Sequence, residues 1–246
     1  QGFPLPEIPL AVQYADYAAW QRRCLTDDVL KDQEDYWKQT LANLPAVNMP
    51  TDYPRPSMQT FRGAYCSIDI PDSTLETLKR FGARHRVTSF MTMLACFQLL
   101  VSRYSCQTDI AIGSPIANRT QMAMEQLIGT FVNTLVIRLD LGGDPSFVEL
   151  MERVKDASLG AFAHQDYAFD RLVDTLQTAR DPSMAPLVQM LFNMVNAPIG
   201  DIQLYGLKWE PFEVDPGSAQ FDLSLTVELE VAKKAYLTFN TDLFKR

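Results

Sequence analysis

Histidine and cysteine, the residues that most often bind transition metals or act as nucleophiles, are scarce in this sequence. The 246 residues include two histidines and four cysteines. The cysteines form no CxxC pair, and no histidine lies at zinc-binding spacing from them. The sequence therefore predicts no metal site. It favours reduced, mostly buried thiols in a cytoplasmic protein, at Cys24, Cys66, Cys96 and Cys106.

Positive charge and long apolar runs are also limited. The chain has 22 Lys and Arg against 30 Asp and Glu, which gives a net charge of −8. A nucleic-acid-binding protein needs a basic face, so we expect no nucleic-acid partner. The longest strongly apolar run, residues 90–101, is interrupted by Thr92 and Gln98 and is too short to span a bilayer, so we expect no membrane partner. Because the sequence begins at Gln1 without a signal-peptide pattern, we interpret it as a piece of a longer protein.

The common catalytic motifs are missing as well. The sequence contains no GxSxG, GxxxxGK[ST], HExxH or GxGxxG motif. His85 lies between two arginines at an expected helix end, where a cation complements the helix dipole. His164 is followed by Gln165 and Asp166 at an expected helix end. Two roles for His164 remain open, a structural one in the helix cap and turn and a chemical one in acid–base catalysis.

Hydrophobic residues make up 47% of the sequence, which is enough to build a sizeable core. Apolar periodicity predicts helices over 14–24, 28–44, 71–85, 88–104 and 147–164, and a shorter one from residue 169. Strands are predicted over 63–70, 109–116, 131–139, 186–195, 203–209, 221–230 and 235–239. Thr26 or Asp27 is expected to cap the second helix, and Asp144 the helix that begins at Phe147. This mixture favours an α/β fold with one mixed β-sheet covered by helices, preceded in residues 1–62 by two entry helices and a Pro-rich connector.

Four segments, in order along the chain, resemble motifs of the condensation domains of non-ribosomal peptide synthetases. Tyr14-Ala-Asp16-Tyr17-Ala-Ala-Trp20-Gln21 is similar to YxDYAxWQ, and Ile128-Gly129-Thr130-Phe131-Val132-Asn133-Thr134-Leu135 with Arg138 is similar to IGxFVNTLxxR. His164-Gln165-Asp166-Tyr167 resembles the start of HQDxPFE, and Arg180-Asp181-Pro182-Ser183 the start of RDxSxxPLxQ. The resemblance implies a chloramphenicol acetyltransferase-like fold.

The resemblance also has a gap. The catalytic HHxxxDG motif of the family lies upstream of the first matched segment, and this sequence contains no His-His pair. We therefore expect residues 1–246 to form the C-terminal lobe of a condensation domain, with the N-terminal lobe absent and no catalytic residue of its own.

In the family, an amine held as a thioester on one carrier protein attacks an acyl or peptidyl thioester on another, in a tunnel between two lobes. The resemblance thus implies amide-bond formation on phosphopantetheine thioesters in the cytoplasm, with no cofactor bound directly. The implied partners are the missing lobe, an upstream donor and a downstream acceptor carrier protein, and adjacent synthetase domains. The lobe would supply tunnel walls and positioning, and we expect it to be inactive alone.

The resemblance also suggests roles for individual residues. The expected substrate-channel residues are Asn133, Thr134, Asn193 and Asn196, although each asparagine is also consistent with an amide satisfied by neighbouring backbone or sheet-end pairing. Arg119, beside Asn118, is expected to pair across the lobe boundary with the aspartate of the missing motif, with an exposed loop arginine as the alternative. The remaining motif residues are expected to be mainly structural: Tyr14, Asp16, Trp20, Gly129, Arg138, His164, Gln165, Asp166, Arg180 and Asp181.

Two other functions remain open at this point. An epimerisation or cyclisation domain shares the same superfamily, although the segment from Gly129 to Thr134 resembles condensation domains. A docking module that keeps this fold to recruit a carrier protein or a tailoring enzyme is the alternative from another class. The residues upstream of Gln1 would discriminate, because an intact HHxxxDG motif indicates an enzyme.

Overall fold

The computed structural model describes residues 10–176, 181–195, 212, 214–230 and 232–246. Its strands are β1 (Gly63–Asp69), β2 (Asp109–Ile116), β3 (Asn133–Asp140), β4 (Met190–Val195), β5 (Leu223–Glu228) and β6 (Lys234–Asn240). Its helices are α1 (Tyr14–Cys24), α2 (Asp27–Thr40), α3 (Asp72–His85), α4 (Ser89–Ser105), α5 (Met122–Glu125), α6 (Phe147–Ala163) and α7 (Phe169–Thr175). The expected strand over 203–209 falls outside the described residues.

The strands form one six-stranded sheet in the order β1-β6-β5-β4-β2-β3. Three neighbouring pairs, β1 with β6, β5 with β6 and β2 with β3, are antiparallel. The pairs of β4 with β5 and with β2 are parallel. The sheet is therefore mixed, as predicted.

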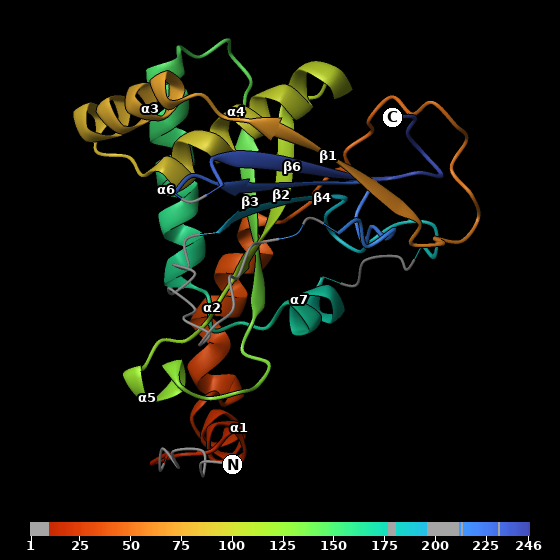
Figure 1. Cartoon of the computed structure of the whole chain (residues 1–246). Coiled ribbons are helices and arrows are strands. Elements are labelled where there is room, and N and C mark those ends of the chain that lie inside the picture. Colours follow the sequence, from red (N-terminus) through yellow and green to blue (C-terminus); the bar gives the residue numbers. More distant parts are fainter. Residues whose placement is uncertain (1–9, 177–180, 196–211, 213, 231) are drawn as a thin grey trace, which may run out of the picture.

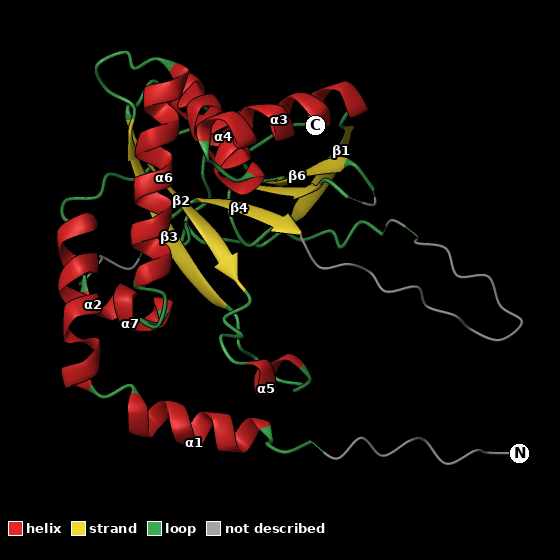
Figure 2. Ribbon diagram, turned by 90° about the vertical axis from the view of Figure 1, so that its left-hand side faces the viewer, coloured by secondary structure: helices red, strands yellow, loops and turns green. Residues whose placement is uncertain are grey.

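Helices cover one face of this sheet. Figures 1 and 2 show α3, α4 and α6 grouped on the same side of the strands. α4 packs against β2 and β4, and α6 packs against β3 and α4. The ring of Phe192 in β4 lies 5.4 Å from that of Phe90 and 6.3 Å from that of Phe97, between centroids. These aromatic side chains and the surrounding aliphatic residues form the main core.

A second, small cluster lies away from the main core. α1 and α5 lie together below the sheet in Figure 2. Tyr17 of α1 packs with Met124, Leu127 and Phe131. This satellite cluster holds the segment between β2 and β3 against α1.

Element boundaries differ from the predictions where turns or side-chain caps decide them. α2 ends at Thr40 and not at residue 44, and Asn43 after it has a left-handed φ of 52°. β3 begins at Asn133, because Phe131 leaves the sheet to join the satellite cluster.

The expected cap of α6 was also wrong. Ser146, and not Asp144, caps this helix: its hydroxyl accepts a hydrogen bond from the Glu149 N–H at 3.3 Å. Asp144 instead occupies the preceding turn with a φ of 50°.

The cysteines are less buried than predicted. Cys24, Cys96 and Cys106 are exposed, and Cys66 is half-buried. All four are free thiols.

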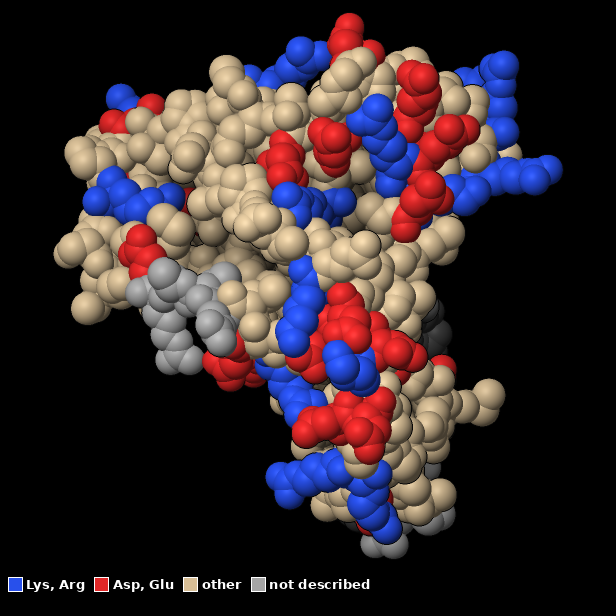
Figure 3. All heavy atoms as spheres, turned by 180° about the vertical axis from the view of Figure 1, so that it is seen from behind, with Lys and Arg blue, Asp and Glu red and all other residues tan. Residues whose placement is uncertain are grey.

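Charges of both signs alternate on the narrow part of the molecule that α1 and α2 form (Figure 3). On α2, Lys31 pairs with Asp35 and Lys38 with Glu34. Within the described residues, no helix combines the length and the apolar character needed to cross a membrane.

Candidate functional site

The face of the sheet that points away from α4 carries hydroxyl and amide groups. Strand alternation places Asn193 of β4 on this face, since Phe192 points into the core. The register sets Asn193 beside Thr226, Thr226 beside Tyr236, and Tyr236 beside Ser67, across four strands. A neighbouring row contains Ser224, Thr238 and Tyr65. We call these residues the polar sheet face: Tyr65, Ser67, Asn193, Ser224, Thr226, Tyr236 and Thr238.

Two of the expected channel residues belong on this side of the sheet. Asn193 is half-buried, and its amide makes no side-chain hydrogen bond within the described part of the chain. Thr134 faces the same way. Leu191, two residues before Asn193 in β4, shares the face of Asn193. A Cβ built on Gly113 would lie 3.3 Å from Leu191 and 3.4 Å from the Thr134 methyl group, so all three positions are on this face. Asn196 lies outside the described residues.

Asn133 lies on the other side of β3, with its amide fully used by the backbone. Its Nδ2 donates to the Gln165 carbonyl at 2.9 Å and to the Tyr167 carbonyl at 3.0 Å. Its Oδ1 accepts from the N–H groups of Phe169, at 3.0 Å, and Thr134, at 2.9 Å. These contacts match the alternative of a satisfied amide, and they tie the α6–α7 turn to the start of β3.

His164 occupies the C-cap of α6, at the entrance to the same turn. Its Nδ1 lies 2.7 Å from the Gly160 carbonyl and therefore carries the proton in this contact. Its ring stacks on Tyr36 of α2, with centroids 3.8 Å apart and planes 2° apart. Its carbonyl accepts a hydrogen bond from Trp37 Nε1 at 3.0 Å. His164 thus joins α6 to α2.

Sequence reasoning missed Gln33, which completes the junction. Its Oε1 accepts from the Tyr167 N–H at 2.9 Å, and its Nε2 lies 3.4 Å from an Asp166 oxygen. Gln33, Tyr36 and Trp37 have the i, i+3, i+4 spacing of one helix face, a signal present in the sequence. Asp166 itself is exposed.

Arg119 belongs to the satellite cluster. Its guanidinium carbon lies 4.2 Å from the centroid of the Phe131 ring, and its Nη1 donates to the Met124 carbonyl. It forms no ion pair with a carboxylate of the described residues. Asn118, just before it, has a left-handed φ of 51° and shapes the loop.

The first motif packs against the second through Tyr14. Its hydroxyl donates to the Thr130 carbonyl at 2.9 Å, and its ring meets Phe131 edge-on at 5.2 Å between centroids. A Cβ on Gly129 would lie only 2.2 Å from this ring. The glycine therefore allows α1 to approach the loop.

The other two residues of the first motif act within α1. Asp16 accepts a hydrogen bond from the Gln13 N–H at 2.9 Å, within the capping box of the helix. Trp20 lies over Tyr17, with centroids 6.0 Å apart, so both occupy one helix face as expected.

Arg138 connects the sheet edge to the end of α2. Its guanidinium makes two bonds to the Asp109 carboxylate, at 2.8 and 2.6 Å. Its Nη1 donates to the carbonyls of Thr40, at 2.9 Å, and Ala42, at 2.8 Å. The Asp109 bonds raise the pKa of the guanidinium.

The last motif forms a turn. Asp181 accepts a hydrogen bond from the Ser183 N–H at 2.8 Å, and hydrogen bonds from Ser183 hold the pKa of the Asp181 carboxyl below its usual range. Arg180 lies outside the described residues. Arg55, which sequence reasoning missed, anchors this turn by donating to the Ser183 carbonyl at 3.1 Å and pairing with the buried Asp222.

The described residues do not bring together three His, Cys, Asp or Glu side chains that could hold a metal ion. Neither histidine hydrogen-bonds a carboxylate in this part of the chain. The amide and hydroxyl side chains described above can form hydrogen bonds to a ligand and hold it in a defined position.

Comparison with known proteins identifies the family. A family model described as "Condensation domain" matches residues 1–246. The chain belongs to the condensation domain family. It is 46% identical to a linear gramicidin synthase of Brevibacillus parabrevis over 244 residues, which cover 98% of this chain and 3% of that protein. It is 41% identical to malpinin synthetase of Mortierella alpina over 247 residues, which cover 100% of this chain and 3% of that protein. The chain therefore spans a small part of the curated relatives that it matches.

Solved structures share the fold. A four-domain nonribosomal peptide synthetase bound to AMP and glycine superposes with a TM-score of 0.85 at 26% identity, over 94% of this chain and 19% of that one. The X-domain in complex with OxyB from teicoplanin biosynthesis gives a TM-score of 0.83 at 25% identity, over 98% of this chain and 55% of that one. The fold is the chloramphenicol acetyltransferase-like fold of condensation domains, as the motifs predicted.

Proposed function

We propose that this chain is the C-terminal lobe of a condensation site that forms amide bonds between carrier-bound thioesters in non-ribosomal peptide synthesis. Membership of the condensation domain family is the observation that carries this proposal. The N-terminal lobe, with its HHxxxDG motif, would complete the site.

The reaction joins an amine to a thioester. The amine nitrogen attacks the carbonyl carbon, a C–N bond forms, and the C–S bond breaks. The amine proton leaves with the departing thiolate as a thiol. Such a step benefits chiefly from positioning of the two reactants.

The polar sheet face is suited to this positioning. Phosphopantetheine arms carry amide groups, which hydrogen-bond to side-chain amides and hydroxyls. Asn193 and Thr226 lie side by side on neighbouring strands, and the Asn193 amide is not used by the described residues. Carrier proteins, upstream for the donor and downstream for the acceptor, would deliver these arms, and adjacent synthetase domains would hold the carriers nearby.

The chain alone is expected to be inactive. His164 is committed to the Gly160 carbonyl and to the ring of Tyr36, which leaves it poorly placed as a general base. His85 lies 4.5 Å from the Phe81 ring, between centroids, at the end of α3. The complementary lobe would therefore supply the catalytic histidine.

The segment between β2 and β3 is proposed to face that lobe. Met122, Ile128 and Val132 expose 84%, 96% and 62% of their surface. Large apolar groups this exposed favour association with a partner. Arg119 lies in the same segment, and only its Nη1 is used by the described residues, so it retains donors for the aspartate of the missing motif.

Reconstitution tests the proposal. Donor and acceptor carriers loaded with defined thioesters are incubated with the 246-residue chain or with its two-lobed parent, and amide product is measured by mass spectrometry. We expect product from the parent only. In the parent, Asn193→Ala should slow single-turnover amide formation, whereas Asn48→Ala, at an exposed site in the connector, should not.

Arg119→Ala in the parent tests the lobe contact separately. Loss of the inter-lobe pair should reduce amide formation by at least about tenfold, because an unpaired carboxylate would remain at the boundary. Wild-type rate and melting temperature in this variant would instead assign Arg119 to the satellite cluster alone.

The similarity to the X-domain favours one second candidate, a docking module of the same fold. That structure is a complex of an X-domain with OxyB. A two-lobed parent that binds a carrier protein or a tailoring enzyme but yields no amide product would support this function over condensation.

A further inference from the structure

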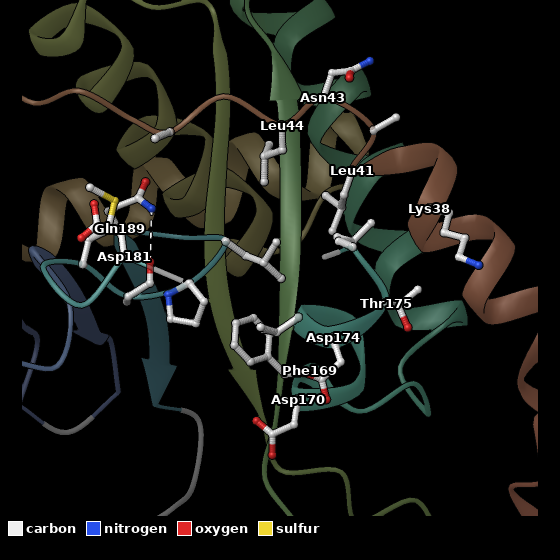
Figure 4. Close-up of a pocket in the computed structure, with 18 residues that line it drawn as sticks. Lys38, Leu41, Asn43, Leu44, Phe169, Asp170, Asp174, Thr175, Asp181 and Gln189 are labelled. Atoms are coloured by element: carbon white, nitrogen blue, oxygen red, sulfur yellow. Dashed lines mark hydrogen bonds between the residues drawn. The ribbon is translucent and has the colours of Figure 1, made fainter. Parts of the chain in front are cut away.

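A cavity of about 1030 Å³ lies apart from the polar sheet face. Figure 4 shows its labelled residues on three segments: α2 and the turn after it, α7, and the segment that contains Asp181 and Gln189. None of its lining residues belongs to the polar sheet face, so a role for it does not depend on amide formation.

The inner surface of the cavity is apolar. Leu41 and Leu187 are buried, and Leu44 and Phe169 are partly buried against the main core. Further apolar lining comes from Val173, Leu176, Met184, Ala185 and Pro186. An apolar side chain of a ligand would find a hydrophobic surface here.

Carboxylates line the same cavity. Asp170 and Asp181 contribute carboxylates, Asp181 with Arg55 nearby, and Lys38, which pairs with Glu34, is the one cation among the described lining residues. Asp170 is exposed, and its carboxylate forms no hydrogen bond or ion pair with the described part of the chain. The local charge therefore favours a cationic ligand.

The walls are held in place by polar contacts. Gln189 is buried, and its Oε1 accepts from the Val47 N–H at 3.1 Å while its Nε2 donates to the Ala185 carbonyl at 3.4 Å. Arg138 fixes the opposite wall through the carbonyl of Ala42 at 2.8 Å. A preformed site loses less conformational entropy when a ligand binds.

We propose that this cavity binds a short peptide segment of a partner protein that presents Lys or Arg next to a large apolar side chain. The apolar side chain contacts the apolar lining, and Asp170 and Asp181, which Figure 4 shows at opposite ends of the cavity, each offer a place for a cation of the peptide. A peptide is favoured over a small amine because the volume is at the upper end for small-ligand pockets, of about 300–1,000 Å³. The acidic lining also runs along two of the three segments, which suits a ligand of several residues.

Selection from a displayed heptapeptide library tests the proposal with the intact 246-residue chain. Peptides are selected on the wild type and counter-selected on Ala42→Trp, which places a large side chain at the exposed cavity wall. Ala83→Trp, at an exposed position of α3, is the matched control. We expect enrichment of Lys or Arg beside Phe, Tyr or Leu, and loss of binding with Ala42→Trp only.

The affinity of an enriched, fluorescein-labelled peptide is then measured by polarisation. Asp170→Asn and Asp181→Asn should each weaken binding by about fivefold, and raised salt should weaken it further. Asp156→Asn, which removes an exposed carboxylate on α6, should have no effect. Because Asp181 also holds the Ser183 turn, Asp170→Asn decides the test if the Asp181 variant fails to fold.

Several outcomes would overturn the proposal. Selection without basic–apolar enrichment would do so, as would equal binding to wild type and Ala42→Trp. Equal weakening by Asp156→Asn would show that only net charge matters. Phenethylamine or arginine amide binding as tightly as the peptide would assign the cavity to a small amine.

Discussion

Replacement of Asn133 by alanine offers the sharpest test of how the chain is held together at the α6–α7 turn. The side chain is 9% exposed, and it makes four hydrogen bonds, all to backbone groups. Asn133→Ala removes the four bonds together. The carbonyls of Gln165 and Tyr167 and the N–H of Phe169 then lose their partner in a site with little access to water.

The expected cost follows from these bonds. A net contribution of about 1 kcal/mol per hydrogen bond gives a loss of about 4 kcal/mol in the free energy of unfolding. With an m-value of about 3 kcal/mol/M in urea, the midpoint should fall by about 1.3 M. Asn133→Asp should also destabilise the fold, because its carboxylate would face the two carbonyl oxygens that the amide now contacts.

Urea unfolding of the 246-residue chain, followed by circular dichroism, measures the effect. Asn193→Ala is the matched control, since its half-buried amide makes no side-chain bond within the described residues and its loss should change stability by no more than about 0.5 kcal/mol. Equal midpoint shifts for the two variants would refute the reasoning. They would show that the Asn133 contacts add no stability beyond that of an ordinary sheet asparagine.

Three further substitutions have defined outcomes. Arg55→Ala should lower the free energy of unfolding by about 3–5 kcal/mol in urea titrations, because Asp222, whose side chain is 3% exposed, would keep a buried unpaired charge; a change under about 1 kcal/mol would contradict this. His164→Ala should cost about 2 kcal/mol of stability while slowing single-turnover amide formation in the two-lobed parent by less than about tenfold. A loss beyond about 100-fold with unchanged melting would instead indicate acid–base chemistry. Gly129→Ala should displace α1, because its methyl group would overlap the Tyr14 ring; hydrogen exchange in residues 14–24 should accelerate, and unchanged exchange would contradict the packing.

Local sequence signals were sufficient for most elements. The bounds predicted for α1 and β2 are those of the structure, because apolar periodicity and flanking turn residues both act locally. Ser146 and Glu149 show where such a signal was overlooked, since S-x-x-E is a capping box that the sequence displays.

Tertiary contacts decided the boundaries that the sequence did not reveal. β4 was expected from Pro186 but begins at Met190, because Leu187 has a left-handed φ of 61° and Gln189 bonds to the distant Val47. The acid-lined cavity was likewise hidden, since its walls come from three segments far apart in the chain. No local pattern reports such a junction.

The two asparagines show which part of the site could have been inferred. Asn133 points to the same face of β3 as Leu135, Ile137 and Leu139, because alternate residues of a strand share a face. A row of large aliphatic side chains on one face indicates the side that packs on the core. A buried amide in such a row must find partners nearby, so this pattern, which sequence reasoning did not use when it assigned Asn133 to the channel, would have favoured a structural role for it. Asn193 follows Phe192 directly and so points to the other face of β4, beside the hydroxyl of Thr226. The asparagine that we propose for the substrate channel is therefore Asn193, because its side chain points away from the core and makes no hydrogen bond within the described residues.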